Sequence, residues 1–315
     1  MTAVVVAERL VKRYDDVTAL ADVSFEVEEG ELFGFIGPDG GGKTSLFRIL
    51  ATLLVPDSGS AHVLGRDAVR EMWALRRVIG YMPGRFALYP DLSVEENLRF
   101  FASVFGTTVE AQYEQIAPIY RQLEPFRTRR AGALSGGMKQ KLALCCALVH
   151  RPEILFLDEP TTGVDAVSRR EFWDLLGTLR ASGLTIVVST PYMDEADRCD
   201  RVALVQRGHL LAIDTPAAVA RRLDRPLVAV TAPDRYRTLQ LLRAMPNTKS
   251  VYPFGETLHY TDARVDARPE DVARELVAHL ASVGVTDATV HEITPTIEDA
   301  FIALMGAPDG ERTAA

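Results

Sequence analysis

The chain has 315 residues, a length typical of about two domains, and its 47% hydrophobic and 25% charged residues are ordinary values for a globular protein. The net charge of −8 argues against a general binder of nucleic acid, because neutralising a phosphate backbone requires a basic surface. The charge leaves room for a local anion pocket, which needs only a few aligned donors.

The first elements along the chain have the pattern of an α/β nucleotide-binding core. Residues 4–27 predict short strands with a turn at Tyr14 and the two aspartates that follow it. The apolar run 32–36 predicts a buried strand, which ends in a glycine-rich loop and continues into the helical spacing of TSLFRILATLL. Strand, glycine loop and helix in this order are typical of the opening of such a core.

Further along, residues 94–123 have a helical pattern and predict a helical insertion in that core. Two unbroken aliphatic runs, 154–157 and 184–188, predict further buried parallel strands.

After about residue 215 the composition changes. Strands are predicted at 227–231, 250–254, 257–260 and 288–293, and helices at 236–245 and 270–282. This order is βαββαβ, the ferredoxin-like pattern, and a closing helix is predicted at 297–305.

The glycine-rich loop is the most specific motif of the chain. It fits GxxxxGK[ST] and follows a predicted strand, and its residues are Gly37, Pro38, Asp39, Gly40, Gly41, Gly42, Lys43 and Thr44. Glycines allow successive backbone N–H groups to point inward, and the start of the following helix adds a partial positive charge. Lys43 can contact the outer phosphates of a nucleotide, and the hydroxyl of Thr44 can bind Mg²⁺.

Two carboxylates, Asp158 and Glu159, end the strand ILFLDEP. At the end of a strand beside a phosphate loop, Asp158 can hold Mg²⁺ and Glu159 can polarise the water that attacks the γ-phosphate. The alternative is a helix cap and a surface salt bridge before the proline.

About twenty residues before Asp158, the segment Leu134-Ser135-Gly136-Gly137 precedes an apolar helix and supplies a second anion-binding helix start. With these motifs in this order, residues 4–215 resemble the nucleotide-binding subunit of an ATP-binding cassette (ABC) transporter. The resemblance implies a P-loop NTPase core of ABC ATPase type, with an antiparallel β subdomain and a helical subdomain at about 90–150. It makes 1–215 the ATPase domain and 216–315 a small α+β domain with a regulatory or dimerising role.

The resemblance also implies roles for individual residues. Residues 37–44 correspond to the Walker A loop, with Ser45 beside it, Asp158 to the Walker B aspartate and Glu159 to the catalytic base, which works with Lys43. Ser135, Gly136 and Gly137 would contact ATP held by a partner cassette, and Asp165 belongs to the D-loop. Tyr14 stands where the family places an aromatic residue against adenine; packing in the core is the alternative.

The chain departs from the family pattern at two positions. Gly84 stands where the family usually has Gln, and Pro191 stands where it usually has His. Neither residue offers a side-chain donor, and the loss of one donor to transition-state charge slows a reaction by typically about 10²–10³. We therefore expect ATP binding to persist and hydrolysis to be slow or to depend on another residue.

The segment Thr294-Pro295-Thr296-Ile297-Glu298-Asp299-Ala300-Phe301 resembles the ending of drug- and antibiotic-exporter cassettes. The resemblance implies an ATPase that uses ATP and Mg²⁺, works as a head-to-tail dimer with a second cassette, and powers multidrug export through a multispan membrane permease. Phe86, Tyr89, Phe100 and Phe101 suit a groove for a permease helix, and core packing explains them equally well.

Three alternatives stay open. One is a weakened cassette that binds ATP and pairs with a more active one, another is a soluble, non-transport ABC protein, and the third is a nucleotide-sensing regulator without turnover. No apolar run approaches the about 18 residues of a membrane span, and the N-terminus lacks secretory-signal features. Cys145, Cys146 and Cys199 lack metal-site spacing. We therefore expect a cytoplasmic protein, peripheral on the inner face of the membrane through its permease, that binds no nucleic acid.

Overall fold

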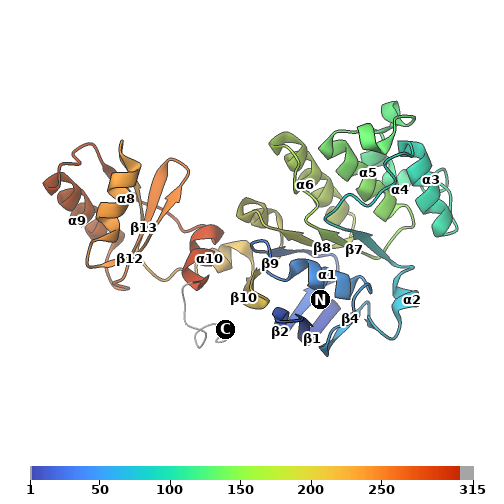
Figure 1. Ribbon diagram of the computed structural model, residues 1–315, viewed down its shortest axis with the longest axis horizontal. Helices are drawn as coiled ribbons and strands as arrows, with labels where there is room; N and C mark the ends of the chain where they lie inside the picture. The colour runs from blue at the N-terminus through green and yellow to red at the C-terminus, as the bar shows by residue number, and fades with distance from the viewer. Residues whose placement is uncertain (1, 306–315) are drawn as a thin grey trace. The chain divides into compact units, whose positions relative to one another are not determined.

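The computed structural model describes residues 2–305, and the chain divides into two compact units between Pro216 and Ala217 (Figure 1). Each unit has its own cluster of buried apolar side chains. Within 2–305, no helix is both long enough and apolar enough to cross a membrane.

The first unit opens with a four-stranded antiparallel sheet in the order β2-β1-β4-β5. Its strands are β1 (Ala3–Tyr14), β2 (Val17–Glu28), β4 (Ser58–Val63) and β5 (Arg66–Asp67). Asp15, in the turn between the first two strands, has a positive φ of 46°, a conformation that Asp tolerates in tight turns.

A six-stranded sheet in the order β10-β9-β3-β8-β7-β6 carries the motifs. Its strands are β3 (Leu32–Ile36), β6 (Ile79–Met82), β7 (Ile154–Asp158), β8 (Thr185–Thr190), β9 (Arg201–Gln206) and β10 (His209–Asp214). All neighbours are parallel except β10 and β9. The register places Asp158 beside Ser189 and Ile36 beside Thr190, so the carboxyl ends of three strands meet at one edge.

Helices occupy the connections between these strands (Figure 1). The insertion between β6 and β7 contains α3 (Val94–Val104), α4 (Tyr113–Tyr120), two 3-10 turns (Glu124–Phe126 and Ala131–Ala133) and α5 (Gly136–Leu148). The other elements are α1 (Lys43–Leu50), α2 (Met72–Leu75), α6 (Ala166–Ala181), the 3-10 helix η3 (Met193–Arg198) and α7 (Pro216–Ala220).

A row of aromatic rings joins the two sheets of the first unit and helix α1. The ring of Phe25 on β2 meets Phe35 on β3 edge-on at 4.8 Å, and Phe35 meets Phe47 on α1 at 5.9 Å. Phe47 then meets Phe156 on β7 at 6.4 Å. Such edge-to-face pairs favour one geometry beyond the burial of area, so α1 and the phosphate loop before it are held against the sheet.

The second unit has the element order βαββαβ, followed by one helix. It consists of β11 (Leu227–Thr231), α8 (Arg235–Arg243), β12 (Thr248–Phe254), β13 (Thr257–Asp262), α9 (Pro269–Ser282), β14 (Thr289–Glu292) and α10 (Ile297–Met305). The sheet is antiparallel with strand order β12-β13-β11-β14, and its core combines apolar residues of the strands with those of α8 and α9.

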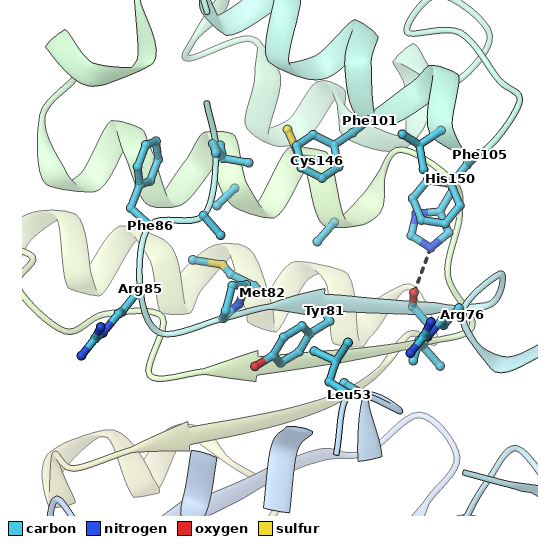
Figure 2. A pocket seen from close by; sticks show the side chains of 18 of the residues that line it. Leu53, Arg76, Tyr81, Met82, Arg85, Phe86, Phe101, Phe105, Cys146 and His150 are labelled. Carbon is cyan, nitrogen blue, oxygen red and sulfur yellow. Dashed lines mark hydrogen bonds between the residues drawn. The ribbon is translucent and has the colours of Figure 1, made fainter. Parts of the chain in front are cut away.

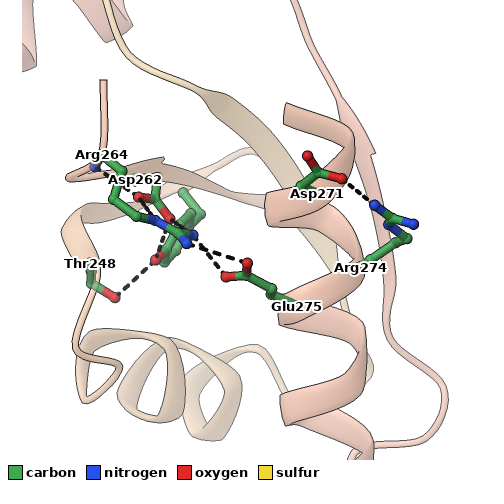
Figure 3. A network of polar contacts seen from close by, with 7 residues as sticks. Thr248, Asp262, Arg264, Asp271, Arg274 and Glu275 are labelled. Atoms are coloured by element: carbon green, nitrogen blue, oxygen red, sulfur yellow. Dashed lines mark hydrogen bonds and ion pairs between the residues drawn. The ribbon is translucent and has the colours of Figure 1, made fainter. Parts of the chain in front are cut away.

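Two clusters of polar side chains connect the last two helices of this unit to strand β13. Arg264 holds the buried Asp262 through two hydrogen bonds of 2.9 Å, and its guanidinium also contacts Glu275 on α9 at 2.7 Å (Figure 3). Asp299 receives hydrogen bonds from the backbone N–H and the hydroxyl of Thr296, which caps α10, and it meets His259 on β13 at 2.7 Å. The exporter-like segment of the sequence is therefore a helix start anchored to the sheet.

Candidate functional site

The glycine-rich loop connects β3 to α1 and lies tightly against two other strands. A Cβ atom added to Gly37 would come within 2.0 Å of the backbone oxygen of Val205, and one added to Gly42 within 2.1 Å of that of Ala19. Gly42 also has a φ of 98°, which strongly favours glycine. Pro38, Asp39 and Gly40 form the exposed crest of the loop.

Lys43 begins α1, and its ammonium turns back into the loop. The Nζ atom donates to the carbonyl oxygens of Gly37 at 2.7 Å and Pro38 at 3.0 Å. It also forms an ion pair with Glu159 at 3.1 Å, and the residue is only 3% exposed. A buried cation thus faces the space that the loop encloses, where an anionic ligand gains most from it.

The two carboxylates lie at the carboxyl end of β7. Asp158 accepts hydrogen bonds at Oδ1 from the hydroxyls of Ser189 at 2.7 Å and Thr44 at 3.3 Å. Burial raises the pKa of Asp158, while the hydrogen bonds from Ser189 and Thr44 act against that rise. The effect of desolvation is larger, so the pKa of Asp158 is raised from its ordinary value.

Glu159 directs its side chain toward the loop through an unusual backbone conformation. Its φ is 50°, a value uncommon for residues other than glycine. The backbone N–H donates to the carbonyl oxygen and the hydroxyl of Ser189, at 3.1 and 2.9 Å. The N–H of Glu159 is thus held by two acceptors on β8. Backbone strain of this kind clusters at functional sites.

Tyr14 lies beside α1. Its hydroxyl is 3.3 Å from Oγ of Ser45, the ring is 41% exposed, and the ammonium of Lys12 lies 5.6 Å from the ring centroid. The ring is therefore half-exposed next to the phosphate loop, an arrangement that favours stacking on a ligand over core packing.

Ser135, Gly136 and Gly137 begin α5, and Ser135 caps the helix by accepting a hydrogen bond from the N–H of Met138 at 3.3 Å. A Cβ atom on Gly137 would lie 2.6 Å from the side chain of Ser168 on α6. Among residues 2–305, no hydrogen bond joins this helix start to the phosphate loop. It neighbours the segment 163–168 instead.

Asp165, predicted as a residue of the nucleotide site, caps α6. Its side chain accepts hydrogen bonds from the N–H groups of Val167 and Ser168, at 3.1 and 3.0 Å. The structure therefore shows a helix-capping role for this carboxylate within the chain.

The two unusual positions both lie near the carboxylates. A Cβ atom on Gly84 would come within 2.9 Å of the carbonyl oxygen of Asp158. The segment after β6 that contains Gly84 therefore lies too close to β7 for a side chain. Pro191 follows Thr190 directly at the end of β8.

The donor set fits a magnesium nucleotide. A hydroxyl and a carboxylate, on Thr44 and Asp158, face one another at 3.3 Å, and hard oxygen ligands of this kind suit Mg²⁺. The buried ammonium of Lys43 and the loop backbone, which leaves no room for a Cβ atom at Gly37, supply the matching cradle for phosphates.

Sequence reasoning assigned no role to two polar residues of this region. Ser189 binds both Asp158 and the backbone of Glu159, and Glu195 is a buried carboxylate on η3. The bonds of Ser189 to Asp158 and Glu159 and that of Glu195 to Thr161 span 30 to 34 positions of the chain, so no local pattern reveals them. Glu195 lies in a stretch with Asp194, Asp197 and Arg198, so nothing in the local sequence marks it as the buried carboxylate.

Comparisons with known proteins agree with this geometry. A family model described as ABC transporter matches residues 20–162. The chain is 40% identical over 310 residues to the probable multidrug ABC transporter ATP-binding protein YbhF of Escherichia coli, covering 96% of this chain and 52% of that protein, so it spans about half the length of that relative. It is 34% identical to the Nod factor export ATP-binding protein I of Burkholderia pseudomallei, covering 95% of this chain and 96% of that protein.

Solved structures give the same answer. A structure of an ATP-binding subunit of an ABC transporter has a TM-score of 0.63 and 28% identity, and covers 70% of this chain and 93% of that chain. The dimeric post-hydrolysis state of the ATP-binding cassette MJ0796, bound to ADP and Pi, has a TM-score of 0.60 and 25% identity, and covers 67% and 98%. The phosphate loop, the paired carboxylates and these similarities together show that the chain belongs to the ATP-binding subunits of ABC transporters.

Proposed function

We propose that this chain binds and hydrolyses Mg-ATP and thereby powers export through a separate membrane permease. One observation carries the proposal: Lys43, Thr44 and the pair Asp158–Glu159 meet at one edge of the parallel sheet, although 114 positions separate Thr44 from Asp158. Export is favoured by the names of two relatives, a probable multidrug transporter protein and a Nod factor export protein.

Each side chain has a defined task in this proposal. Lys43 binds the outer phosphates, and Thr44 and Asp158 would hold Mg²⁺, which when bound neutralises charge on the phosphate oxygens. Glu159 lies within reach of Lys43 and orients the attacking water as a general base. The half-exposed ring of Tyr14 stacks on the base of the nucleotide.

A second cassette completes the site. The first N–H groups of a helix have no partner within the helix, and Gly136 at the start of α5 is exposed, which leaves its amide open to an anion. Because this helix start has no hydrogen bond to the phosphate loop of its own chain, a triphosphate on a partner cassette is the ligand we assign to it. The cassette MJ0796 has a dimeric structure in a post-hydrolysis state bound to ADP and Pi, which supports an assembly of two cassettes.

The test combines binding and assembly. We expect the variant Glu159→Gln to bind ATP and to form a dimer in size-exclusion chromatography with Mg-ATP, since it keeps every nucleotide contact and lacks the base. The same experiment with ADP should give a monomer. A variant that stays monomeric at saturating ATP would contradict the proposed head-to-tail dimer.

We further propose that hydrolysis at this site is slow, because Gly84 and Pro191 offer no side-chain donor to the γ-phosphate. The variant Pro191→His should raise kcat by about 10-fold or more, given the usual value of one such donor. Gly84→Gln is the weaker test, because its Cβ would clash with the carbonyl oxygen of Asp158. An ordinary turnover in the unmodified chain, with no gain from Pro191→His, would contradict slow hydrolysis.

The first unit has an apolar groove of about 610 Å³, which we propose as the docking site of the permease (Figure 2). Of the four aromatic residues considered for a permease groove, Phe86 and Phe101 line this pocket, whereas Tyr89 and Phe100 lie outside its lining and pack edge-on against each other at 4.9 Å. The groove is open, and Trp73 on its rim is 70% exposed. An exposed apolar groove of this size is typical of a site for a partner helix.

The charges of the groove indicate the chemistry of that helix. Arg76, Arg77 and Arg85 line it, and none of its lining residues is a carboxylate, in a chain with net charge −8. The permease segment should therefore be apolar with at least one acidic side chain.

A charge placed in the groove tests this surface. Val104 is 62% exposed in the groove, so Val104→Glu should fold. If the unmodified chain co-purifies from membranes with a multispan protein, as the proposal requires, Val104→Glu should lose that protein. Val265→Glu, at a 49% exposed valine of the second unit, is the matched control and should retain that protein. Equal retention by both variants would remove the groove from the interface.

A further inference from the structure

Glu195 is a carboxylate buried at the end of the parallel sheet, on the side of the phosphate loop. It lies on η3, just beyond β8, and is 3% exposed. A buried carboxylate is costly unless hydrogen bonds and cations compensate it, so the groups that face it are informative.

Three elements supply those groups. The hydroxyl of Thr161, in the loop after β7, donates to Oε1 at 2.9 Å, and the hydroxyl of Thr190, at the end of β8, donates to Oε2 at 2.5 Å. From α6, Nε of Arg169 lies 3.6 Å from Oε1, and the same guanidinium binds Asp194 at 2.8 Å. Both threonines are fully buried.

Each threonine is joined to a part of the nucleotide site. Thr161 follows Glu159 by two positions and precedes the segment Thr162-Gly163-Val164-Asp165 that begins α6. The carbonyl oxygen of Thr190 accepts a hydrogen bond from the N–H of Gly37 at 3.2 Å, and its neighbour Ser189 holds the backbone of Glu159. The carboxylate of Glu195 therefore binds both segments that border Glu159, the loop after β7 and the end of β8. The end of β8 also contacts the phosphate loop.

We propose that Glu195 is a positioning residue for hydrolysis: it fixes the loop after β7 relative to the end of β8, and so fixes the angle at which Glu159 addresses the γ-phosphate. This inference rests on the proposed ATPase function. Pro191 has no side-chain donor that could bind the end of β8 to the phosphate. In this proposal the carboxylate of Glu195 fixes the end of β8 instead, through the hydroxyl of Thr190.

The test replaces Glu195 with Gln, which keeps the shape and removes the charge that accepts both hydroxyl hydrogens. We expect kcat for ATP to fall about 10-fold or more, with the Kd of a fluorescent ATP analogue changed by less than about 2-fold, because a positioning residue acts on the transition state alone. The amides of 159–164 should exchange hydrogen faster, since the N–H groups of Thr162 and Val164 bond within the loop that Glu195 holds, and the N–H of Glu159 bonds to Ser189 on β8.

Glu31→Gln is the matched control. Glu31 is also buried, is paired with Arg201 at 3.4 Å, and lies before β3, at the opposite end of the strand from the phosphate loop. It should lose stability without a change of kcat or of exchange in 159–164. Equal loss of kcat in both variants at equal loss of stability would overturn the proposal.

Thr161→Val keeps the test decisive if Glu195→Gln does not fold. It removes one hydroxyl donor at constant shape and should lower kcat with unchanged nucleotide Kd. Faster exchange in 159–164 without any ATPase activity of the unmodified chain would refute the proposed function while supporting the positioning contact. Unchanged exchange in 159–164, together with unchanged kcat, would refute the role of Glu195 alone.

Discussion

Removal of the ammonium of Lys43 has an effect that can be worked out from its contacts. Nζ lies 2.7 and 3.0 Å from the carbonyl oxygens of Gly37 and Pro38 and 3.1 Å from the carboxylate of Glu159. The side chain of Lys43 is almost completely buried. Lys43→Met keeps most of the stem and removes the charge. A hydrogen bond to a charged group contributes about 1.5–3 kcal/mol, so ATP should bind about 10- to 150-fold more weakly.

The assay is equilibrium titration with a fluorescent ATP analogue in the presence of Mg²⁺. The control is Lys141→Met, which removes a second buried ammonium, 2.6 Å from Glu171 and Gln122. It should lower the melting temperature and leave the nucleotide Kd unchanged, because Lys141 lies beyond the helix start at 135–137 and, among residues 2–305, has no hydrogen bond to the phosphate loop. A Kd within about 2-fold of the unmodified chain for Lys43→Met would refute the assignment of the loop to phosphate binding.

Two further predictions concern stability. Gly37→Ala should destabilise the chain by more than about 2 kcal/mol in urea unfolding, because its Cβ would lie 2.0 Å from the carbonyl oxygen of Val205. Gly40→Ala is the control: Gly40 has a positive φ and open space around it, so the substitution should cost about 1 kcal/mol. Similar losses of stability in the two variants would contradict this account. Burial raises the pKa of Asp262 and the hydrogen bonds from Arg264 lower it, and the net pKa is below the ordinary 3.8. The ion pair of Asp262 with Arg264 therefore stabilises the second unit above about pH 4. This stabilisation is lost as the pH falls through the lowered pKa of Asp262. Asp262→Asn should therefore be less stable at neutral pH by about 1–3 kcal/mol, with a difference that shrinks on acidification in thermal unfolding, and a difference that grew with acid would contradict the sign.

Local patterns in the sequence determined the elements and the most specific motif. The short apolar run at 32–36 predicts the strand, and the glycines and the lysine that follow it predict the phosphate loop and the start of the helix. The strand at 227–231 and the helix at 297–305 follow in the same way from periodicity. Such features depend on neighbours within a few positions, so the chain order alone contains them.

The tertiary structure decided which distant groups meet. Only the register of β7 and β8 brings Ser189 onto Asp158, and only the packing of η3 brings Glu195 to Thr161. The same holds for the absent side chain at Gly84, which the carbonyl oxygen of Asp158 excludes. These contacts join segments 30 or more positions apart, and their energies come from burial and from hydrogen bonds that exist once the sheet has formed, so nothing in a local stretch of sequence encodes them.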